Sequence, residues 1–236
     1  MKPWALYLYD LRWSVRAWAR APWFVVLAVV LQGGLVALAG KVIALVLPLE
    51  LFLAGFVGTE RIFYLRAYRG ERLYWREVLP MTWRFLGRFV VLGLIVSIPA
   101  GVLYVIVDIA TRPALHHHFG LTIWSRITLL VFGMVLDVLL TFVVPALAFS
   151  TRSAGEALRL GVGMLKGAWP ASAWYAFAPG LTVAAVALAL PRSVIGYWPA
   201  VAVAMAGGAL GLAFKGAAVP FYLQRTYGVG LNGATE

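Results

Sequence analysis

The chain has 236 residues, of which 63% are hydrophobic and only 12% are charged, and 20 Lys and Arg against nine Asp and Glu give a formal charge of +11. Soluble domains are about 45–50% apolar and about 25% charged, so this composition excludes an ordinary soluble protein and a disordered chain. The apolar residues form continuous runs and do not alternate with polar ones, which argues against an outer-membrane β-barrel.

The basic residues fall between the apolar runs. A bilayer with anionic headgroups is therefore the expected partner, and nucleic acid is not. The chain has no cysteine, which excludes disulfides, a thiol nucleophile and a cysteine-ligated metal.

Residues 3–20 have the pattern of an amphipathic helix. Apolar residues recur at three- and four-residue spacing: Trp4, Leu8, Leu11, Val15 and Trp18. Charged residues occupy other positions: Asp10, Arg12, Arg16 and Arg20. This pattern predicts that residues 1–22 form an interfacial helix lying flat on the membrane surface, with its arginines at the lipid headgroups. Pro22 then stands where a new helix can begin.

Six apolar runs approach the roughly 20 helical residues that a bilayer core requires. They are residues 23–39, 42–58, 86–107, 127–149, 171–190 and 199–223. We therefore predict an all-α polytopic membrane protein with six transmembrane helices and a single membrane domain. The spans pair into hairpins 23–58, 86–149 and 171–223, and residues 224–236 form a tail.

The distribution of Lys and Arg predicts the orientation. With six spans, residues 1–22, 59–85, 150–170 and the C-terminal tail share one side of the membrane, which carries fifteen basic residues when Arg88 and Arg225 at the span ends are included. The other side carries four: Lys41, Arg112, Arg126 and Arg192. Because basic residues concentrate on the cytoplasmic side, both termini are predicted to be cytoplasmic.

Two cytoplasmic segments between the hairpins are also predicted to be helical. In residues 60–79, four arginines follow one helical stripe among aromatic side chains: Arg66, Arg69, Arg72 and Arg76. We expect one amphipathic helix here, weakened at Gly70 and ended by Pro80. Together with Arg12 and Arg16, these arginines either dock a cytoplasmic or membrane protein partner or lie solvated at the lipid surface.

Residues 153–168 begin with Ser153-Ala154-Gly155-Glu156, which has the S-x-x-E spacing of a capping box. The hydroxyl of Ser153 can accept a hydrogen bond from the amide of Glu156, whose carboxylate can reach back to the first amide. We therefore interpret Glu156 as a helix cap and not as a catalytic acid.

Three charged residues lie inside the predicted spans: Glu50, Asp137 and Lys215. The two carboxylates fall near the membrane midplane, and Lys215 lies slightly toward the cytoplasm. Each shares a helical face with small residues, as Lys215 does with Gly207 and Gly211, and small residues mark close helix contacts. We expect the three charges to converge inside the bundle, either as a proton or cation relay or polar substrate site, or as a cluster that holds three helices in register.

Catalytic and metal-binding patterns are weak in this sequence. His116, His117 and His118 lie in an outer loop, where adjacent residues cannot all face one ion, so we expect a solvated or interfacial loop and no metal site. The sequence has no H-E-x-x-H, no G-x-S-x-G and no P-loop motif. We therefore expect no enzymatic activity, no catalytic residues and no cofactor.

Several short motifs carry a family resemblance. They are Phe56-Val57-Gly58, Arg69-Gly70-Glu71, Trp75, Arg84-Phe85, Pro145-Ala146-Leu147, Glu156-Ala157-Leu158 and Lys166-Gly167. With the six-span layout, they look like bacterial six-helix membrane proteins of unknown function related to the membrane domain fused to some glycerophosphodiester phosphodiesterases. The resemblance implies a bacterial inner-membrane protein and transfers no catalytic residue, because the phosphodiesterase chemistry in those fusions belongs to a separate soluble domain that this sequence lacks.

The layout also resembles the permease subunit of ABC-2 type exporters, through the six spans, the N-terminal interfacial helix and a candidate coupling helix in residues 59–85. Residues 191–198 are too short for the outer re-entrant segment expected before the last span of such a permease. Two functions are therefore left open. One is a non-catalytic scaffold or accessory subunit of a membrane complex, and the other is a permease component of a transporter.

Overall fold

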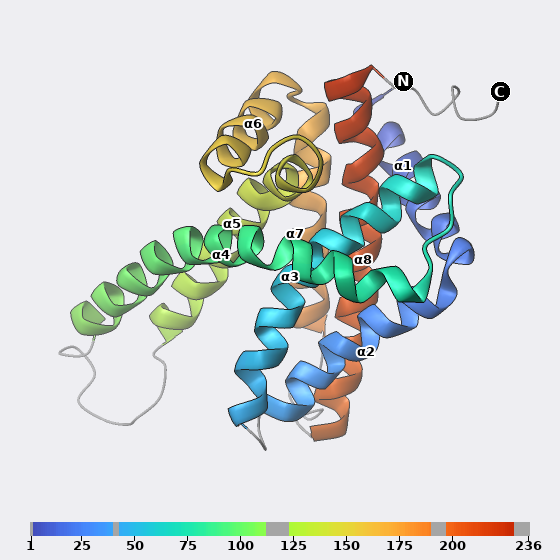
Figure 1. The fold of residues 1–236 in the computed structure, drawn as a ribbon. Helices are drawn as coiled ribbons and strands as arrows, with labels where there is room; N and C mark the ends of the chain where they lie inside the picture. The colour runs from blue at the N-terminus through green and yellow to red at the C-terminus, as the bar shows by residue number, and fades with distance from the viewer. Residues whose placement is uncertain (1, 40–42, 112–122, 190–196, 229–236) are drawn as a thin grey trace.

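The computed structural model describes residues 2–39, 43–111, 123–189 and 197–228, and within these ranges the chain is all-helical (Figure 1). In chain order the helices are α1 (Pro3–Ala17), the 3₁₀ helix η1 (Trp18–Arg20), α2 (Pro22–Ala39), α3 (Ile43–Tyr68), α4 (Trp75–Thr111), α5 (Ile123–Phe149), α6 (Ala154–Gly167), α7 (Ala171–Ala189) and α8 (Tyr197–Tyr227). The predicted all-α fold is confirmed.

Each of the six apolar runs lies on a different helix: α2, α3, α4, α5, α7 and α8. By length and composition, two helices of the described chain can cross a membrane, over Trp75–Leu103 and Val201–Tyr227. A third candidate is a bent pair, Pro3–Arg20 with Pro22–Leu35, whose two parts meet at 105°. Two or three helices of the described chain are therefore long and apolar enough to cross.

The helices do not all run in one direction. The C-terminal end of α2 and the N-terminal ends of α3 and α8 lie on the lower side of Figure 1, whereas α4 runs across the bundle and its two ends lie at similar heights. The C-terminal end of α8 and helix α6 lie on the opposite side, and α8 runs through the middle of the bundle. Helices α1 and α6 therefore lie away from the lower ends of α2, α3 and α8.

The core consists of two aromatic clusters on either side of α8. One cluster contains Phe142, Tyr175 and Phe221, with ring centroids 4.4 Å apart for Tyr175 and Phe221. The other contains Phe24 and Phe63, whose centroids are 4.9 Å apart. In a bilayer the hydrophobic effect does not drive helices to associate, so close side-chain packing and interhelical hydrogen bonds stabilise their association.

Glycines allow the helices to approach closely. A Cβ at Gly55 would overlap the backbone carbonyl of Thr82, and one at Gly216 would overlap the side chains of Ser14 and Tyr64. By contrast, a Cβ at Gly211 would meet nothing within 4 Å. The close contact on this part of α8 is therefore made by Gly216, and not by the glycine face that the spacing of Lys215 suggested.

The segment 60–79 does not form the single helix expected from its arginine stripe. Helix α3 continues through residue 60 to Tyr68 and ends because Gly70 adopts a left-handed conformation, with φ of 79°. The amide of Gly70 donates to the carbonyl of Ala67, and the amide of Glu71 donates to the carbonyl of Arg66. These two bonds form a Schellman motif, which satisfies the last carbonyls of the helix.

Pro80 lies inside α4 and does not end a helix as expected. A proline removes its own amide donor and crowds the carbonyl one turn earlier, but the helix can continue past it where neighbouring groups compensate. Residues 59–85 are thus divided among the end of α3, a short connection and the first turns of α4.

Helix α6 agrees with the predicted helix over 153–168, and its cap is partly as expected. The Ser153 hydroxyl accepts from the amide of Glu156. The Glu156 carboxylate, however, accepts a hydrogen bond from the Thr151 hydroxyl at 2.5 Å, and Thr151 in turn accepts from the amide of Ser153. Thr151 therefore takes the place that the carboxylate holds in a complete capping box.

Candidate functional site

Two buried polar groups lie where α1 packs against α7 and α8. Asp10 and Ser14 are fully buried, on a face of α1 that also buries Tyr7 and Ala17. The Tyr175 hydroxyl donates to Oδ2 of Asp10 at 2.5 Å, and Oδ1 has no hydrogen-bond partner. Burial raises the pKa of the Asp10 carboxyl to about 7, although the Tyr175 hydrogen bond lowers it. Asp10 is thus a core residue of the bundle and not a headgroup-facing charge.

Side chains of α1 and α3 hydrogen-bond to the backbone of α8. Ser14 donates to the carbonyl of Ala213 at 2.8 Å, and Tyr64 donates to the carbonyl of Leu212 at 2.8 Å. The Trp18 indole donates to the Tyr64 hydroxyl at 2.9 Å. These bonds fix α1 and α3 against the same turn of α8, next to Gly216.

Lys215 pairs with a residue that was expected in a cytoplasmic loop. Its Nζ lies 3.7 Å from Oε2 of Glu60, whose carboxylate is buried and accepts no hydrogen bond at that oxygen. The neighbouring Arg61 is also buried and donates to the backbone carbonyl of Lys215. The charge cluster beside α8 is therefore Glu60, Arg61 and Lys215.

Glu50 does not join this cluster, whereas the Asp137 carboxylate on α5 attracts the Arg61 guanidinium of the cluster electrostatically. Both are exposed on the surface of the described chain, which is the surface that lipid or another protein would cover. Within the described residues, no ion pair connects either carboxylate to Lys215. Lys215 therefore pairs with Glu60 and not with either predicted carboxylate, and of these two only Asp137 interacts with the cluster, through Arg61.

A pocket of about 380 Å³ lies between α2, α3 and α8. Its walls are mainly apolar, including Leu53, Phe56 and Ala204, and its polar lining comes from Gln32 and Glu60. A buried carboxylate at the edge of an apolar pocket can hold a cation or a hydrogen-bond donor.

A second pocket of about 580 Å³ lies where the end of α1 and η1 face the α3–α4 connection. It is lined by three arginines, Arg16, Arg20 and Arg72, and by Trp23 and Tyr74. We call this pocket the arginine cleft. All three arginines are exposed, and within the described residues none of their guanidinium groups forms an ion pair with a carboxylate.

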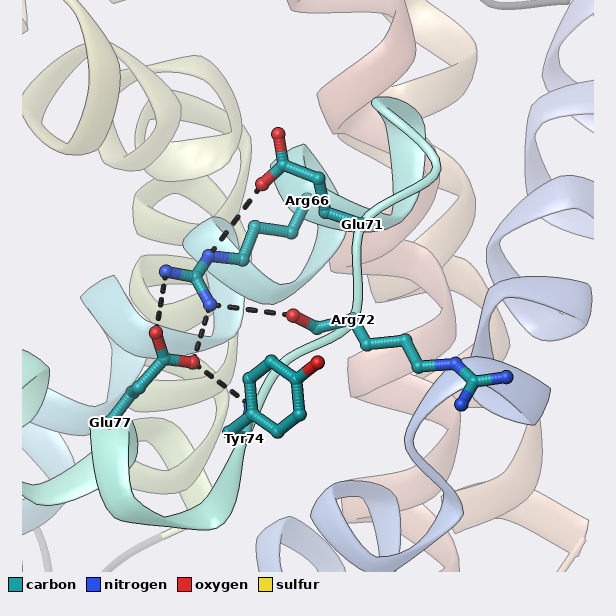
Figure 2. Close-up of polar contacts among 5 residues, drawn as sticks. All are labelled: Arg66, Glu71, Arg72, Tyr74 and Glu77. Carbon is teal, nitrogen blue, oxygen red and sulfur yellow. Dashed lines mark hydrogen bonds and ion pairs between the residues drawn. The ribbon is translucent and has the colours of Figure 1, made fainter.

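The connection that carries Arg72 is held by a compact polar network (Figure 2). The Arg66 guanidinium donates to both Glu77 oxygens, at 2.5 and 3.0 Å, and its Nε lies 4.0 Å from Glu71. Arg66 also donates to the backbone carbonyl of Arg72 at 3.4 Å, and the amide of Tyr74 donates to Glu77 at 3.0 Å. Figure 2 shows the Arg72 side chain extending away from this network, toward α1 and α2.

The six arginines expected to dock a membrane surface or partner therefore divide into groups. Arg16 and Arg72 line the arginine cleft, whereas Arg66 faces Glu77 and positions the backbone. Arg12, Arg69 and Arg76 are exposed outside the cleft, with the Arg76 guanidinium 5.5 Å from the ring centroid of Trp75.

Sequence reasoning missed Asp10 and Glu60 as interior groups. A signal was present for Asp10, because Tyr7, Asp10, Ser14 and Ala17 repeat at three- and four-residue spacing and form a second stripe on α1. Glu60 directly follows an apolar run without an intervening Pro, so the helix could be expected to continue through it.

His116, His117 and His118 lie outside the described residues. Within the described part of the chain, no group of three or more His, Asp or Glu side chains could hold a metal ion. Compared with known proteins, the chain matches no protein-family model, no curated protein and no solved structure.

Proposed function

We propose that the protein is a non-catalytic, multi-pass protein of the bacterial inner membrane, which acts as a scaffold or accessory subunit of a membrane complex. The observation that carries this proposal is that buried polar side chains form hydrogen bonds between helices. Ser14, Tyr64 and Arg61 bond to the backbone of α8, and Asp10 bonds to Tyr175. Groups committed to holding helices together are not free to act on a substrate.

The proposed topology has six transmembrane helices with both termini in the cytoplasm. It is supported by the placement of each apolar run on its own helix and by the uneven distribution of Lys and Arg between the two predicted sides of the membrane. The 105° bend between α1 and α2 also suits an interfacial helix followed by a spanning one. Single-cysteine labelling tests it: Arg69→Cys should react only from the cytoplasmic side and His117→Cys only from the outer side. The reverse pattern would overturn the topology.

The scaffold proposal is tested on membranes prepared from the native host. After gentle detergent extraction, the 25.7 kDa chain should migrate in an assembly containing a second, stoichiometric polypeptide. Purified protein in liposomes should give the same basal proton flux as its Glu60→Gln variant. Migration as the chain alone would contradict the scaffold role.

The second candidate is a permease component, and the pocket beside Glu60 is the observation that favours it. Its apolar lining and single carboxylate suit an amphiphilic or cationic substrate. A flux into liposomes that is lost in Glu60→Gln would support this candidate and overturn the scaffold. The family resemblance and the ABC-2 resemblance stay predictions, and neither assigns a substrate.

A further inference from the structure

We propose that the arginine cleft binds the phosphate group of an anionic phospholipid headgroup. The inference rests on the proposed membrane location and adds a specific ligand site to it. Arg16 and Arg20 approach from the end of α1 and from η1, and Arg72 approaches from the α3–α4 connection. Three guanidinium groups from segments more than 50 residues apart in the sequence thus line one pocket.

The charge of the cleft calls for an anion. No carboxylate lines it, and the acidic residues of the adjoining connection, Glu71 and Glu77, are both directed at Arg66. Guanidinium groups present planar arrays of N–H donors that match phosphate oxygens, which makes arginine the usual phosphate ligand at such sites. With a volume of about 580 Å³, the cleft is large enough for a headgroup.

The network in Figure 2 gives the cleft a fixed wall. Arg66 is held by two bonds to Glu77 and itself holds the carbonyl of Arg72, while Glu77 holds the amide of Tyr74. Arg66 therefore binds the backbone that carries Arg72, while the Arg72 side chain extends toward α1 and α2 and lines the same pocket as Arg16 and Arg20. A preorganised site loses less entropy when a ligand binds.

The aromatic residues argue for a lipid and not a free phosphate. Trp23 and Tyr74 line the cleft and are 36% and 62% exposed, and Trp75 beside them is 70% exposed. Exposed Trp and Tyr side chains are typical of the membrane–water interface. Trp23 also stands at the start of α2, where the chain turns from the interfacial helix into the first apolar run. The cleft therefore lies at headgroup depth.

The test measures lipid binding to the full-length protein in a neutral detergent by native mass spectrometry. The probes are dioctanoyl phosphatidylglycerol, dioctanoyl phosphatidylcholine and inorganic phosphate. The cleft variant is R16Q/R20Q/R72Q. The matched control R12Q/R69Q/R76Q removes the same charge from exposed positions outside the cleft, and gel filtration confirms that both variants remain folded.

For the first bound phosphatidylglycerol, each cleft arginine should contribute about fivefold to Kd, so the cleft variant should bind on the order of a hundredfold more weakly. The control should change Kd by less than about fivefold. Phosphatidylcholine should bind wild type more weakly than phosphatidylglycerol does, and inorganic phosphate at equal concentration should not displace the lipid.

If phosphatidylglycerol binds equally weakly to the two triple variants, the cleft is not a specific site and binding depends only on net charge. Displacement by inorganic phosphate would overturn the lipid as the ligand. Either result leaves the proposed scaffold role standing, whereas extraction of the wild-type chain from native membranes by alkaline carbonate would refute the membrane location itself.

Discussion

Replacing Gly216 by alanine tests the contact between α8 and the two helices that hydrogen-bond to it. An added Cβ would overlap the side chains of Ser14 and Tyr64. Inserting a methyl group into a close-packed interior costs about 1–3 kcal/mol. Displacing the Ser14 and Tyr64 side chains would also weaken their bonds to the Ala213 and Leu212 carbonyls, each worth about 1 kcal/mol.

Against these costs stands the gain in helix propensity, because alanine is better than glycine in a helix interior by up to about 1 kcal/mol. Summing the terms, Gly216→Ala should lower the free energy of unfolding by about 2–4 kcal/mol. For a chain of this size that corresponds to a fall in Tm of roughly 4–16 °C.

Gly211→Ala is the matched control, because a Cβ there meets nothing within 4 Å on the same helix. It should be neutral or stabilise the protein by up to about 1 kcal/mol. Both variants are measured by thermal melting and by denaturant titration in the same detergent. If Gly216→Ala is as stable as Gly211→Ala, the close crossing of α1, α3 and α8 is wrong.

Three further variants test the polar contacts. In the wild type, the pKa of Asp10 is raised to about 7 in the folded state, so the folded state holds the proton more tightly and stability should fall by up to about 4 kcal/mol as the pH rises from about 4 to about 7. In Asp10→Asn this fall should disappear. Identical dependence of stability on pH in the two proteins would contradict the raised pKa. Lys215→Met should destabilise the bundle by about 1–3 kcal/mol because it leaves the buried Glu60 unpaired. Adding Glu60→Gln should restore part of that loss, and a double variant less stable than Lys215→Met would contradict the pairing. Glu77→Gln removes the charge that binds the Arg66 guanidinium and should weaken this interaction by about 1 kcal/mol, so amide hydrogen exchange in residues 69–74 should accelerate. Unchanged exchange there would show that the network does not order the α3–α4 connection.

Much of the secondary structure follows directly from the sequence. Continuous apolar runs and the helical spacing of Trp4, Leu8 and Val15 are strong signals for a helix, although these three side chains are exposed on α1. The cap at Ser153 is local, so its geometry can be read from four neighbouring residues. These elements needed no knowledge of which helix lies beside which.

The polar contacts could not be predicted without knowing which helices lie side by side. The stripe of Arg66, Arg69, Arg72 and Arg76 has helical spacing, but α3 ends at Tyr68, two residues before Gly70 with its positive φ, so only Arg66 lies in that helix. The glycine was interpreted as a weak point of one helix, although its freedom at positive φ makes it the usual residue after a helix end.

The partner of Lys215 was mistaken for a related reason. Only charged residues inside the apolar spans were considered as its partners, and Glu60 was placed in the cytoplasmic amphipathic segment 59–85. In the structure, α3 continues past the apolar run and brings Glu60 to the lysine. The continuation of the helix through Glu60 could be expected from the local sequence, but its pairing with Lys215 is decided by the packing of α3 against α8.

The buried face of α1 has a consequence for how the protein is made. Asp10 bonds to Tyr175, 165 residues later, and Ser14 bonds to Ala213, 199 residues later. Because translation runs from the N-terminus, α1 can acquire these two partners only after α7 and α8 have been synthesised. Until then, the Asp10 carboxylate and the Ser14 hydroxyl must be satisfied by water or other groups, so the docking of α1 onto α7 and α8 is a late step in folding.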